Sequence, residues 1–490
     1  MACKRALKAV DVLVATFLVA VIAICLPSAG RSTLLFALLG FGVLACAAYT
    51  VSRASEKVLD ITFAALLCLY AVFVFVVACQ LKLEPSWDFG RVYNGAKEII
   101  INNSLEYTYN YFLESHNNFF VALYIARFVQ MCGSIFTLSV LDGGIYLNVI
   151  SIVLSVLFIY LAARVSLGAR TAFITGVLCF GFAPLLSYSP IFYTDTLSLP
   201  YVSLSLWLIA LGIKKERGLL KTLLLGTVTG LVVFVGFKLK ATAAFTLVAA
   251  CVVCLLGERR QKVWKYLAAS VVTCSVLFVV YASWISNTTL IEYKNLDQYR
   301  LPPMHYVLMG LRGIGGYNGA DHQAAQALPD ADTRTRVAKE KIAAQLEEYG
   351  FSGMRDHMVQ KIRFTWNAGL FYSDQKLAQN KAMYTTAQSY ASPEGLNFPQ
   401  YHAYAQSFHW LMLLTIMTSA VKAVFDRRRE EVVDIARVAI FGIVLLLLVW
   451  ETRSRYLVNF IPLFALCEAE FVCSVFRKKN TSRRIRGEHA

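Results

Sequence analysis

The sequence predicts an all-α polytopic membrane protein with about twelve spans, and three observations support this fold class. Of its 490 residues, 57% are hydrophobic and only 16% are charged, whereas an average soluble domain is about 45–50% apolar and about 25% charged. The apolar residues come in blocks of roughly 18–22 residues almost free of charge, the length that crosses a bilayer core of about 30 Å. Lys and Arg cluster between alternate blocks, as they do in cytoplasmic loops.

The net charge of +16, from 47 Lys and Arg against 31 Asp and Glu, would raise the question of nucleic-acid binding in a soluble protein. Here most basic residues fall between predicted spans on one side of the membrane. The charge therefore reports topology, and no nucleic-acid partner is expected.

The sidedness of the basic clusters fixes how many of the thirteen apolar blocks cross. With the N-terminus inside, an odd number of spans must separate the outer segment 82–118 from the cytoplasmic Arg164. Block 119–138 carries Arg127 at its middle, where a lipid-facing charge costs about 2.5 kcal/mol or more. We therefore interpret 119–138 as an amphipathic helix at the outer surface, which leaves about twelve spans and both termini cytoplasmic.

The chain divides by composition into segments of different expected roles. Residues 288–406 have 12 basic and 11 acidic residues, a balance that predicts a small extracytoplasmic domain. The expected division is two extra N-terminal spans at 1–60, a transmembrane core at 61–287 with the first outer loop 82–118, the extracytoplasmic domain 288–406, C-terminal spans at 407–476 and a basic cytoplasmic tail at 477–490.

Asp88 follows directly on the third span, beside Trp87, at the predicted outer membrane face. A carboxylate at this depth fits a general base or a cation ligand. It also fits a helix N-cap, because Asp is a favoured cap and residues 90–101 have helical composition.

Two further outer turns carry charge at the lipid boundary. Tyr193-Thr194-Asp195 lies between two spans, where Asp195 could bind a substrate or cap the next helix. Lys238 and Lys240 lie on the outward side, where lysine is disfavoured. They could bind a phosphate or extend their ammonium groups to the interface.

The last outer turn, Glu451 to Tyr456, places a glutamate and two arginines in six residues. Arg453 and Arg455 suit bidentate phosphate contacts, or could pair internally with Glu451.

His305 lies in an apolar stretch of the outer segment, where a lone histidine is either structural or functional. Neither a metal-ligand spacing nor a glycine-rich phosphate loop is found, so no cofactor is predicted, although a divalent metal is not excluded.

Taken together, these segments resemble the membrane glycosyltransferases of the GT-C fold, which take sugars from polyprenyl-phosphate carriers at the outer membrane face. The resemblance covers about residues 61 to 475 and rests on the order and common sidedness of its motifs: Asp88 after a span, Phe-Tyr-Thr-Asp at 192–195, His305 to Asp321 with Lys361 and Trp366–Gly369, and Glu-x-Arg-x-Arg-Tyr at 451–456. The outer stretch is most similar to uncharacterised Gram-positive members associated with cell-wall polymers. A single acid at Asp88 departs from the Asp-x-Asp of oligosaccharyltransferases, which weakens the case for a metal or a protein acceptor.

The resemblance implies a GT-C-like helical bundle in the plasma membrane that transfers a sugar, hexosyl or pentosyl, from a polyprenyl-phosphate donor to a hydroxyl of a cell-wall or envelope glycan. A phosphate leaves as an anion, so the reaction needs no general acid, unlike glycosidases. We expect Asp88 to be the base and the reaction to invert the anomeric carbon. Lys240, Arg453 and Arg455 would hold the donor phosphate. The expected positioning residues are Asp195, Tyr193, Glu451, Tyr456 and His305.

A transporter or flippase of lipid-linked sugars is the alternative, with the same outer charges binding a headgroup. Transporters usually place their polar site near the bilayer midplane. A third interpretation is a non-enzymatic envelope scaffold, which would leave Asp88 and Asp195 without a role.

Overall fold

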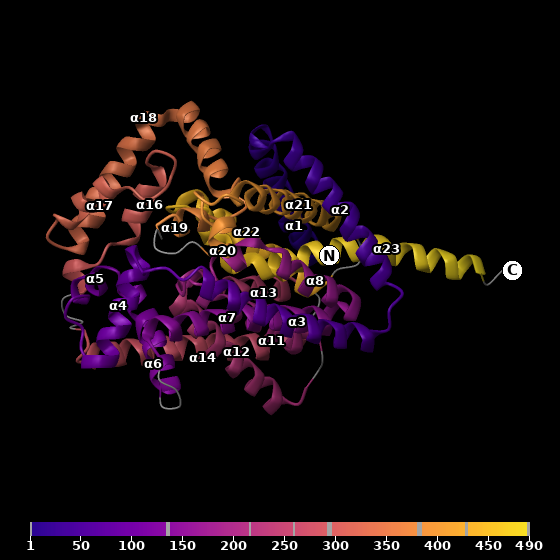
Figure 1. The fold of residues 1–490 in the computed structure, drawn as a ribbon, viewed down its shortest axis with the longest axis horizontal. Coiled ribbons are helices and arrows are strands. Elements are labelled where there is room, and N and C mark those ends of the chain that lie inside the picture. Colours follow the sequence, from indigo (N-terminus) through magenta and orange to yellow (C-terminus); the bar gives the residue numbers. More distant parts are fainter. Residues whose placement is uncertain are drawn as a thin grey trace.

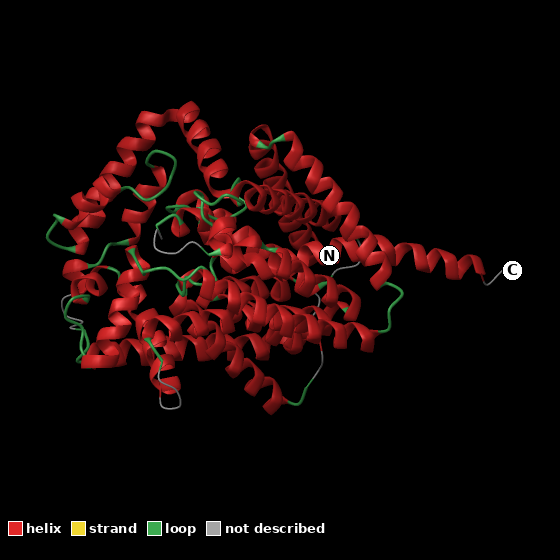
Figure 2. Cartoon of the chain, viewed as in Figure 1, coloured by secondary structure: helices red, strands yellow, loops and turns green. Residues whose placement is uncertain are grey.

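Helices make up nearly all of the regular structure (Figure 2). The computed structural model describes residues 2–133, 138–214, 217–257, 260–291, 296–379, 385–426 and 430–487, and the side chains of these except 2–7, 260–262, 296–297 and 476–487. Within these residues no strand occurs. Some basic residues expected on the cytoplasmic side lie outside the described part: the side chains of Lys4, Arg5 and the tail, and residues Arg259 and Arg427–Arg429.

The helices follow one another with short connections. In chain order they are α1 (Ala2–Cys25), α2 (Arg31–Val51), α3 (Glu56–Gln80), α4 (Trp87–Asn102), α5 (Tyr109–Glu114), α6 (Phe119–Gly133), α7 (Val140–Leu167), α8 (Ala169–Gly181), α9 (Ala183–Ser187), α10 (Thr194–Leu197), α11 (Leu199–Lys214), α12 (Leu219–Leu239), α13 (Phe245–Leu256), α14 (Arg260–Asn287), α15 (Leu296–Tyr299), α16 (Pro303–Leu311), α17 (Gly319–Gln326), α18 (Ala331–Trp366), α19 (Ser373–Leu377), α20 (Thr386–Ala391), α21 (Phe398–Phe425), α22 (Glu431–Val449) and α23 (Ile461–Gly487). The 3₁₀ turns are η1 (Leu26–Ser28), η2 (His116–Asn118), η3 (Ala241–Ala244) and η5 (Ser454–Phe460).

Ten helical segments of the described chain are long and apolar enough to cross a membrane. They lie in α1, α2, α3, α7, α10–α11, α12, α14, α21, α22 and η5–α23. Two expected spans are shorter apolar helices, Ala169–Gly181 and Ala241–Leu256. The chain is therefore a polytopic helical membrane protein, and the expected count of about twelve is reached only when these two short helices are included.

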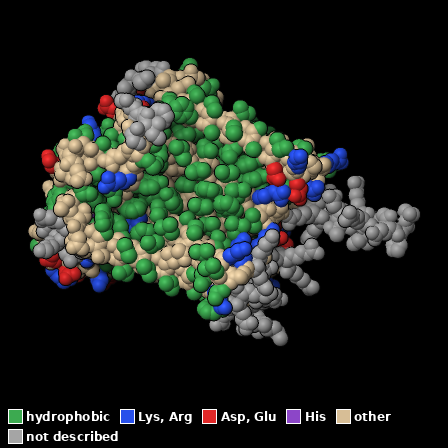
Figure 3. Space-filling view, turned by 90° about the horizontal axis from the view of Figure 1, so that it is seen from below, with side chains coloured by type: hydrophobic (Ala, Val, Ile, Leu, Met, Phe, Trp, Pro, Cys, Tyr) green, Lys and Arg blue, Asp and Glu red, His purple; other side chains and the backbone are tan. Residues whose placement is uncertain are grey.

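Most of the long helices lie side by side along the long axis of the molecule, whereas the bent α18 lies above them (Figure 1). Helices α4, α5, α6 and α17 gather at one end, while the C-terminus lies at the other. Figure 3 shows a broad apolar surface across the middle of one face, with Lys, Arg, Asp and Glu towards its two ends. This pattern is the one expected of a bundle whose waist contacts lipid and whose ends contact water.

Ion pairs join the start of α3 to the end of α7. Arg164, near the end of α7, contacts Glu56 at 2.9 Å and Asp60 at 3.0 Å, both at the start of α3. Arg164 belongs to the basic residues predicted to be cytoplasmic, so this pair marks the end of the bundle opposite to α4–α6.

Helix α6 covers the first fifteen residues of the block expected to lie on the outer surface. It is not among the ten full-length segments. One face of it is buried, through Phe119, Ala122, Ile125 and Val129, whereas Arg127 is exposed and donates to Gln130 at 2.9 Å. The amphipathic character predicted for this block is therefore present in α6, and residues 134–137 lie outside the described part.

The outer segment 288–406 packs directly on the bundle. Buried side chains from it, such as Ile362, Trp366 and Phe371, belong to the same hydrophobic cluster as the membrane helices. Helix α21 begins at Phe398 and continues without a break into a span, so the expected boundary at residue 406 falls inside a helix. Helix α18 bends at Gly350, whose φ of 51° lies in the left-handed region that favours glycine.

Two glycines let α12 and α14 approach closely. A Cβ on Gly226 would lie 2.7 Å from the carbonyl oxygen of Tyr266, and one on Gly230 would meet the carbonyl oxygen of Ser270. These glycines are four residues apart and lie on one face of α12, as in the small-residue interfaces of membrane helices.

We expect Gly230→Val to separate α12 from α14 and to destabilise the folded protein by about 1–3 kcal/mol, the usual cost of overpacking. Thermal unfolding of the purified protein in detergent checks this. Leu231→Val, at an exposed position on the same helix, is the matched control and should leave the melting temperature nearly unchanged. Equal melting temperatures for the two variants would contradict the packing described here.

Candidate active site

Five segments distant in sequence meet at the end of the bundle that carries α4 and α5. They are the start of α4, the start of α10, the turn between α12 and η3, helix α19, and the turn between α22 and η5. Each contributes a charged side chain to one cluster: Asp88, Asp195, Lys240, Lys376, Arg453 and Arg455, with Glu451 beside them. We call this set the outer cluster.

Asp88 is the second residue of α4, and its carboxylate does not cap that helix. The N-cap position is Ser86, and Trp87 has a φ of 47°, in the left-handed region. Gly90 permits this tight entry, because a Cβ there would lie 2.7 Å from the carbonyl oxygen of Pro85. Asp88 Oδ1 instead accepts a hydrogen bond from the hydroxyl of Tyr111 at 3.2 Å.

A polar chain connects Asp88 to the second outer turn. Asn118 Nδ2 donates to the hydroxyl oxygens of Tyr111, at 2.6 Å, and of Tyr193, at 3.1 Å. The ring of Tyr193 meets that of Trp87 edge to face, with centroids 5.6 Å apart. Burial raises the pKa of Tyr193 well above its usual value, and the charges of Asp88 and Asp195 add to this. The charges of Asp88 and Asp195 therefore both act on the hydroxyl of Tyr193.

Asp195 forms an ion pair with Lys240. Its side chain is buried, and its Oδ1 accepts from Lys240 Nζ. Burial lowers the pKa of Lys240, and the neighbouring Asp195 opposes that shift. Asp195 is the second residue of the four-residue α10, where Tyr193 holds the N-cap position, so its carboxylate is used for pairing and not for capping.

Lys238 and Lys240 contact different parts of the structure. Lys238 Nζ lies 3.9 Å from the ring centroid of Tyr281 on α14, which fits the alternative that it serves the interface. Lys240 turns into the outer cluster, where its ammonium also lies 5.2 Å from the ring centroid of Tyr456.

The two arginines of the last outer turn are held against aromatic rings. Arg455 Cζ lies 5.2 Å from the ring centroid of Tyr456, 5.8 Å from that of Tyr193 and 5.9 Å from that of Trp87. Arg453 Cζ lies 4.5 Å from the ring centroid of Tyr372. Within the described residues neither arginine has a carboxylate within ion-pair distance, so the proposed internal pairing with Glu451 is not formed.

Glu451 is buried beneath this turn. Its Oε1 accepts from the hydroxyl of Tyr456 at 3.2 Å. Burial raises the pKa of Glu451, although Arg455 and Tyr456 act in the opposite direction. Its backbone N–H donates to the carbonyl of Tyr306 at 3.0 Å, which ties the turn to α16.

Lys376 is a member of the outer cluster that sequence reasoning missed. Its Nζ lies 3.4 Å from the ring centroid of Trp87 and 5.4 Å from that of Tyr372. Burial lowers its pKa to about 7, helped by Arg455 and Arg453 and opposed by Asp88 and Asp195. The local sequence does not distinguish Lys376 from other lysines, because the segment 288–406 has nearly equal numbers of basic and acidic residues.

Two buried N–H groups of the outer cluster lack a hydrogen-bond partner among the described residues: Nε1 of Trp87 and Nε of Arg455. Buried polar groups are usually satisfied. Unsatisfied donors close to a cationic group are suited to the oxygens of an anionic ligand.

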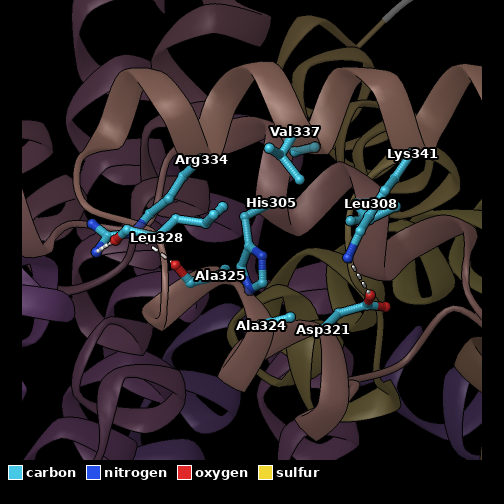
Figure 4. A pocket seen from close by; sticks show the side chains of 10 residues that line it. His305, Leu308, Asp321, Ala324, Ala325, Leu328, Arg334, Val337 and Lys341 are labelled. Carbon is cyan, nitrogen blue, oxygen red and sulfur yellow. Dashed lines mark hydrogen bonds and ion pairs between the residues drawn. The ribbon is translucent and has the colours of Figure 1, made fainter.

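His305 lies apart from the outer cluster, in a small pocket between α16, α17 and α18 (Figure 4). The pocket also contains Asp321 and Lys341, whose charged atoms are 3.7 Å apart, and Arg334, which donates to backbone carbonyls including that of Ala325 at 2.9 Å. Burial lowers the pKa of His305 to about 4. The expected role of His305 in positioning a substrate therefore has no geometric support from the outer cluster.

Lys361, part of the resemblance described above, has a structural contact. Its Nζ donates to the carbonyl oxygens of Gly310, at 2.7 Å, and Leu448, at 3.0 Å. It thereby fastens α18 to α16 and to the end of α22, next to the turn that carries Arg453.

In the described part of the chain, no three His, Cys, Asp or Glu side chains are placed to hold a metal ion.

A family model described as "Conserved hypothetical integral membrane protein" matches residues 18–474. The chain belongs to this family. Among curated proteins no match is found.

Two solved structures have a similar arrangement of the chain. ArnT from Cupriavidus metallidurans, bound to undecaprenyl phosphate, is 14% identical with a TM-score of 0.39, over 83% of this chain and 77% of ArnT. The oligosaccharyltransferase of Archaeoglobus fulgidus, in a complex with zinc and sulfate, is 13% identical with a TM-score of 0.42, over 84% of this chain and 50% of its own. The reaction of this family member has to be inferred from its own side chains.

We expect Asp195→Asn and Lys240→Gln each to destabilise the protein by about 3–5 kcal/mol, because each leaves a buried charge without its partner. The double variant should recover part of this loss. Thermal unfolding in detergent measures the coupling. The half-exposed pair Lys82–Asp142, 2.7 Å apart, is the matched control, and its coupling should be below about 1 kcal/mol. Equal couplings for the two pairs would contradict the buried pair.

Proposed function

We propose that this protein transfers a sugar from a polyprenyl-phosphate donor to a hydroxyl group of a cell-envelope glycan, at the outer face of the plasma membrane. The observation that carries this proposal is an excess of cations beside an unpaired carboxylate. Lys376, Arg453 and Arg455 have no carboxylate within ion-pair distance among the described residues, and Asp88 has no cation within that distance.

The excess of cations favours an anionic ligand. Of the three carboxylates in the outer cluster, Asp195 is already used by Lys240, and Glu451 is buried beneath the last turn, where it accepts a hydrogen bond from Tyr456. Arginine binds phosphate oxygens through two parallel N–H donors. The unsatisfied N–H groups of Trp87 and Arg455 supply further donors for such a ligand.

Asp88 suits the role of the base. A carboxylate paired with a cation is a weaker proton acceptor, because the cation stabilises its charged form. Asp88 has one hydrogen bond, from Tyr111, which orients it without neutralising it. Its place on α4, rather than on a loop, holds it at a fixed distance from the cationic groups.

The proposed reaction is a direct displacement. The acceptor oxygen forms a bond to the anomeric carbon and gives its proton to Asp88, while the bond from that carbon to the donor phosphate oxygen breaks. The electron pair leaves with the phosphate, where Lys240, Arg453 and Arg455 stabilise the growing charge. Asp195, Tyr193, Glu451 and Tyr456 would hold these groups and the sugar in place. A single displacement inverts the anomeric centre.

The orientation proposed here follows the basic residues. Arg164 and the other predicted cytoplasmic cations belong to the end of the bundle opposite to the outer cluster, and the cytoplasmic side carries the excess of Lys and Arg. Both termini would then be cytoplasmic. A lipid-linked donor would reach Arg455 and Asp88 from the outer leaflet, and the glycan acceptor from outside the cell.

The transporter alternative is less well supported. Transporters bind their cargo near the bilayer midplane, between broken helices, whereas the outer cluster lies at the ends of α4, α10 and α12. One further carboxyl group, that of Glu468, is fully buried in a candidate span. Glu468 is the eighth residue of α23, whereas Arg453 and Arg455 precede that helix.

We expect Asp88→Asn to lower the rate of sugar transfer about 10²–10⁴-fold, the usual contribution of a general base. The measurement is transfer from a polyprenyl-phosphate sugar to an envelope glycan by the protein in proteoliposomes. Asp356→Asn, at an exposed carboxylate of α18, is the matched control and should keep full activity. Near-normal transfer by Asp88→Asn would overturn the assignment of the base.

The stereochemistry gives a second test. The anomeric configuration of the product, read from proton coupling constants in NMR spectra, should be opposite to that of the donor. Retention would require a covalent intermediate or a second carboxylate acting at the anomeric carbon, and would contradict the single displacement.

A further inference from the structure

The position of Lys376 raises a question that the donor clamp does not answer. Helix α19 is only five residues long. The pair of residues that precedes it, Phe371 and Tyr372, has φ values of 50° and 67°, in the left-handed region. Such backbone is strained and persists only where surrounding contacts impose it. The hydroxyl of Tyr188 supplies one such contact, donating to the carbonyl of Phe371 at 2.7 Å.

The strained turn places Lys376 where none of the described carboxylates lies within ion-pair distance. The side chain of Lys376 is 9% exposed. Its neighbours in the outer cluster are Arg453 and Arg455 from the last turn, Asp88 from α4, Asp195 from α10, and the rings of Trp87 and Tyr372. Burying an ammonium is costly unless it is paired. Here the aromatic faces compensate only in part.

We propose that Lys376 binds the phosphate of the substrate and makes the site select the doubly charged leaving group over the singly charged donor. This inference rests on the proposed function and deepens it. In the transfer, the donor phosphodiester carries one negative charge. Once the bond to the anomeric carbon breaks, the phosphate monoester carries two, while Asp88 loses its charge by taking the acceptor's proton. Negative charge therefore moves away from Asp88 and towards the cations.

A lysine suits this change better than a third arginine would. The pKa of about 7 leaves Lys376 partly neutral in the free site, so the ground-state monoanion gains little from it. An additional negative charge raises the pKa of a neighbouring ammonium and draws a proton onto it. The interaction is thus stronger with the leaving group than with the donor, which is the condition for accelerating the chemical step.

The test compares two probes that differ in charge: farnesyl phosphate, a monoester, and its methyl ester, a diester. Above pH 7 the monoester is a dianion, since its second pKa is about 6, and the diester is a monoanion. Binding to the full-length protein in nanodiscs is measured by titration calorimetry at pH 7, 8 and 9.

We expect the unmodified protein to prefer the monoester and to lose several-fold of that affinity between pH 7 and pH 9, as Lys376 deprotonates. Lys376→Gln should bind the monoester about tenfold more weakly at pH 7 and bind the diester almost normally, because a charge-assisted contact is lost only with the dianion. Lys376→Arg should bind the diester more tightly than the unmodified protein does, so that its preference for the monoester is smaller, and its binding should show no pH dependence. Lys339→Gln, at an exposed lysine of α18, is the matched control and should behave as the unmodified protein.

The outcomes separate the two claims. If neither probe binds the unmodified protein, the phosphate site is absent, and both the proposed function and this inference fall. If both probes bind but Lys376→Gln keeps the normal preference and pH dependence, the role of Lys376 alone is overturned. Folding of each variant is followed by its melting temperature, and Lys376→Arg preserves the charge should Lys376→Gln fail to fold.

Discussion

Four cations share the outer cluster with carboxylates that neutralise only one of them directly. Lys240 has Asp195, whereas Lys376, Arg453 and Arg455 lie on the faces of aromatic rings. Aromatic faces stabilise a cation without occupying its hydrogen-bonding capacity. The arrangement keeps positive charge at one end of the bundle and leaves the hydrogen-bond donors of these cations available. The helix ends that meet there hold the cations in place.

The backbone at this end of the bundle departs from ideal geometry where the charged groups enter. Of the four non-glycine residues with left-handed φ in the described part, Trp87, Phe371 and Tyr372 belong to or border the outer cluster. Strain of this kind collects at functional sites because surrounding contacts must impose it. The rest of the bundle supplies those contacts: Gly90 allows the entry to α4, and Lys361 fastens α18 beside the last turn.

Sidedness made most of the cluster predictable. Asp88, Asp195, Lys240, Arg453 and Arg455 each follow or precede an apolar block on the side where charge is rare, and this signal needs no tertiary information. The expected helices of the spans follow from the same blocks. The GT-C resemblance rests on the same turns.

Other features depend on packing that the sequence does not display. Lys376 has no apolar block beside it and is buried only because α19 turns under Trp87. His305 looked like a site residue because it stood alone among apolar neighbours, yet α16 directs it into a different pocket from the outer cluster. The tyrosine network through Asn118 is equally hidden, because its partners are separated by up to 75 residues. Periodicity predicts which residues face inward, but not which inward residues meet.

A structure of the full-length protein in a nanodisc with a bound polyprenyl phosphate tests the central claim most directly. The account predicts phosphate density within hydrogen-bond distance of Arg455 and at least one of Arg453, Lys376 and Lys240, on the same side of the bundle as Asp88. Phosphate bound in the interior near Glu468, or at the end marked by Arg164, would contradict it.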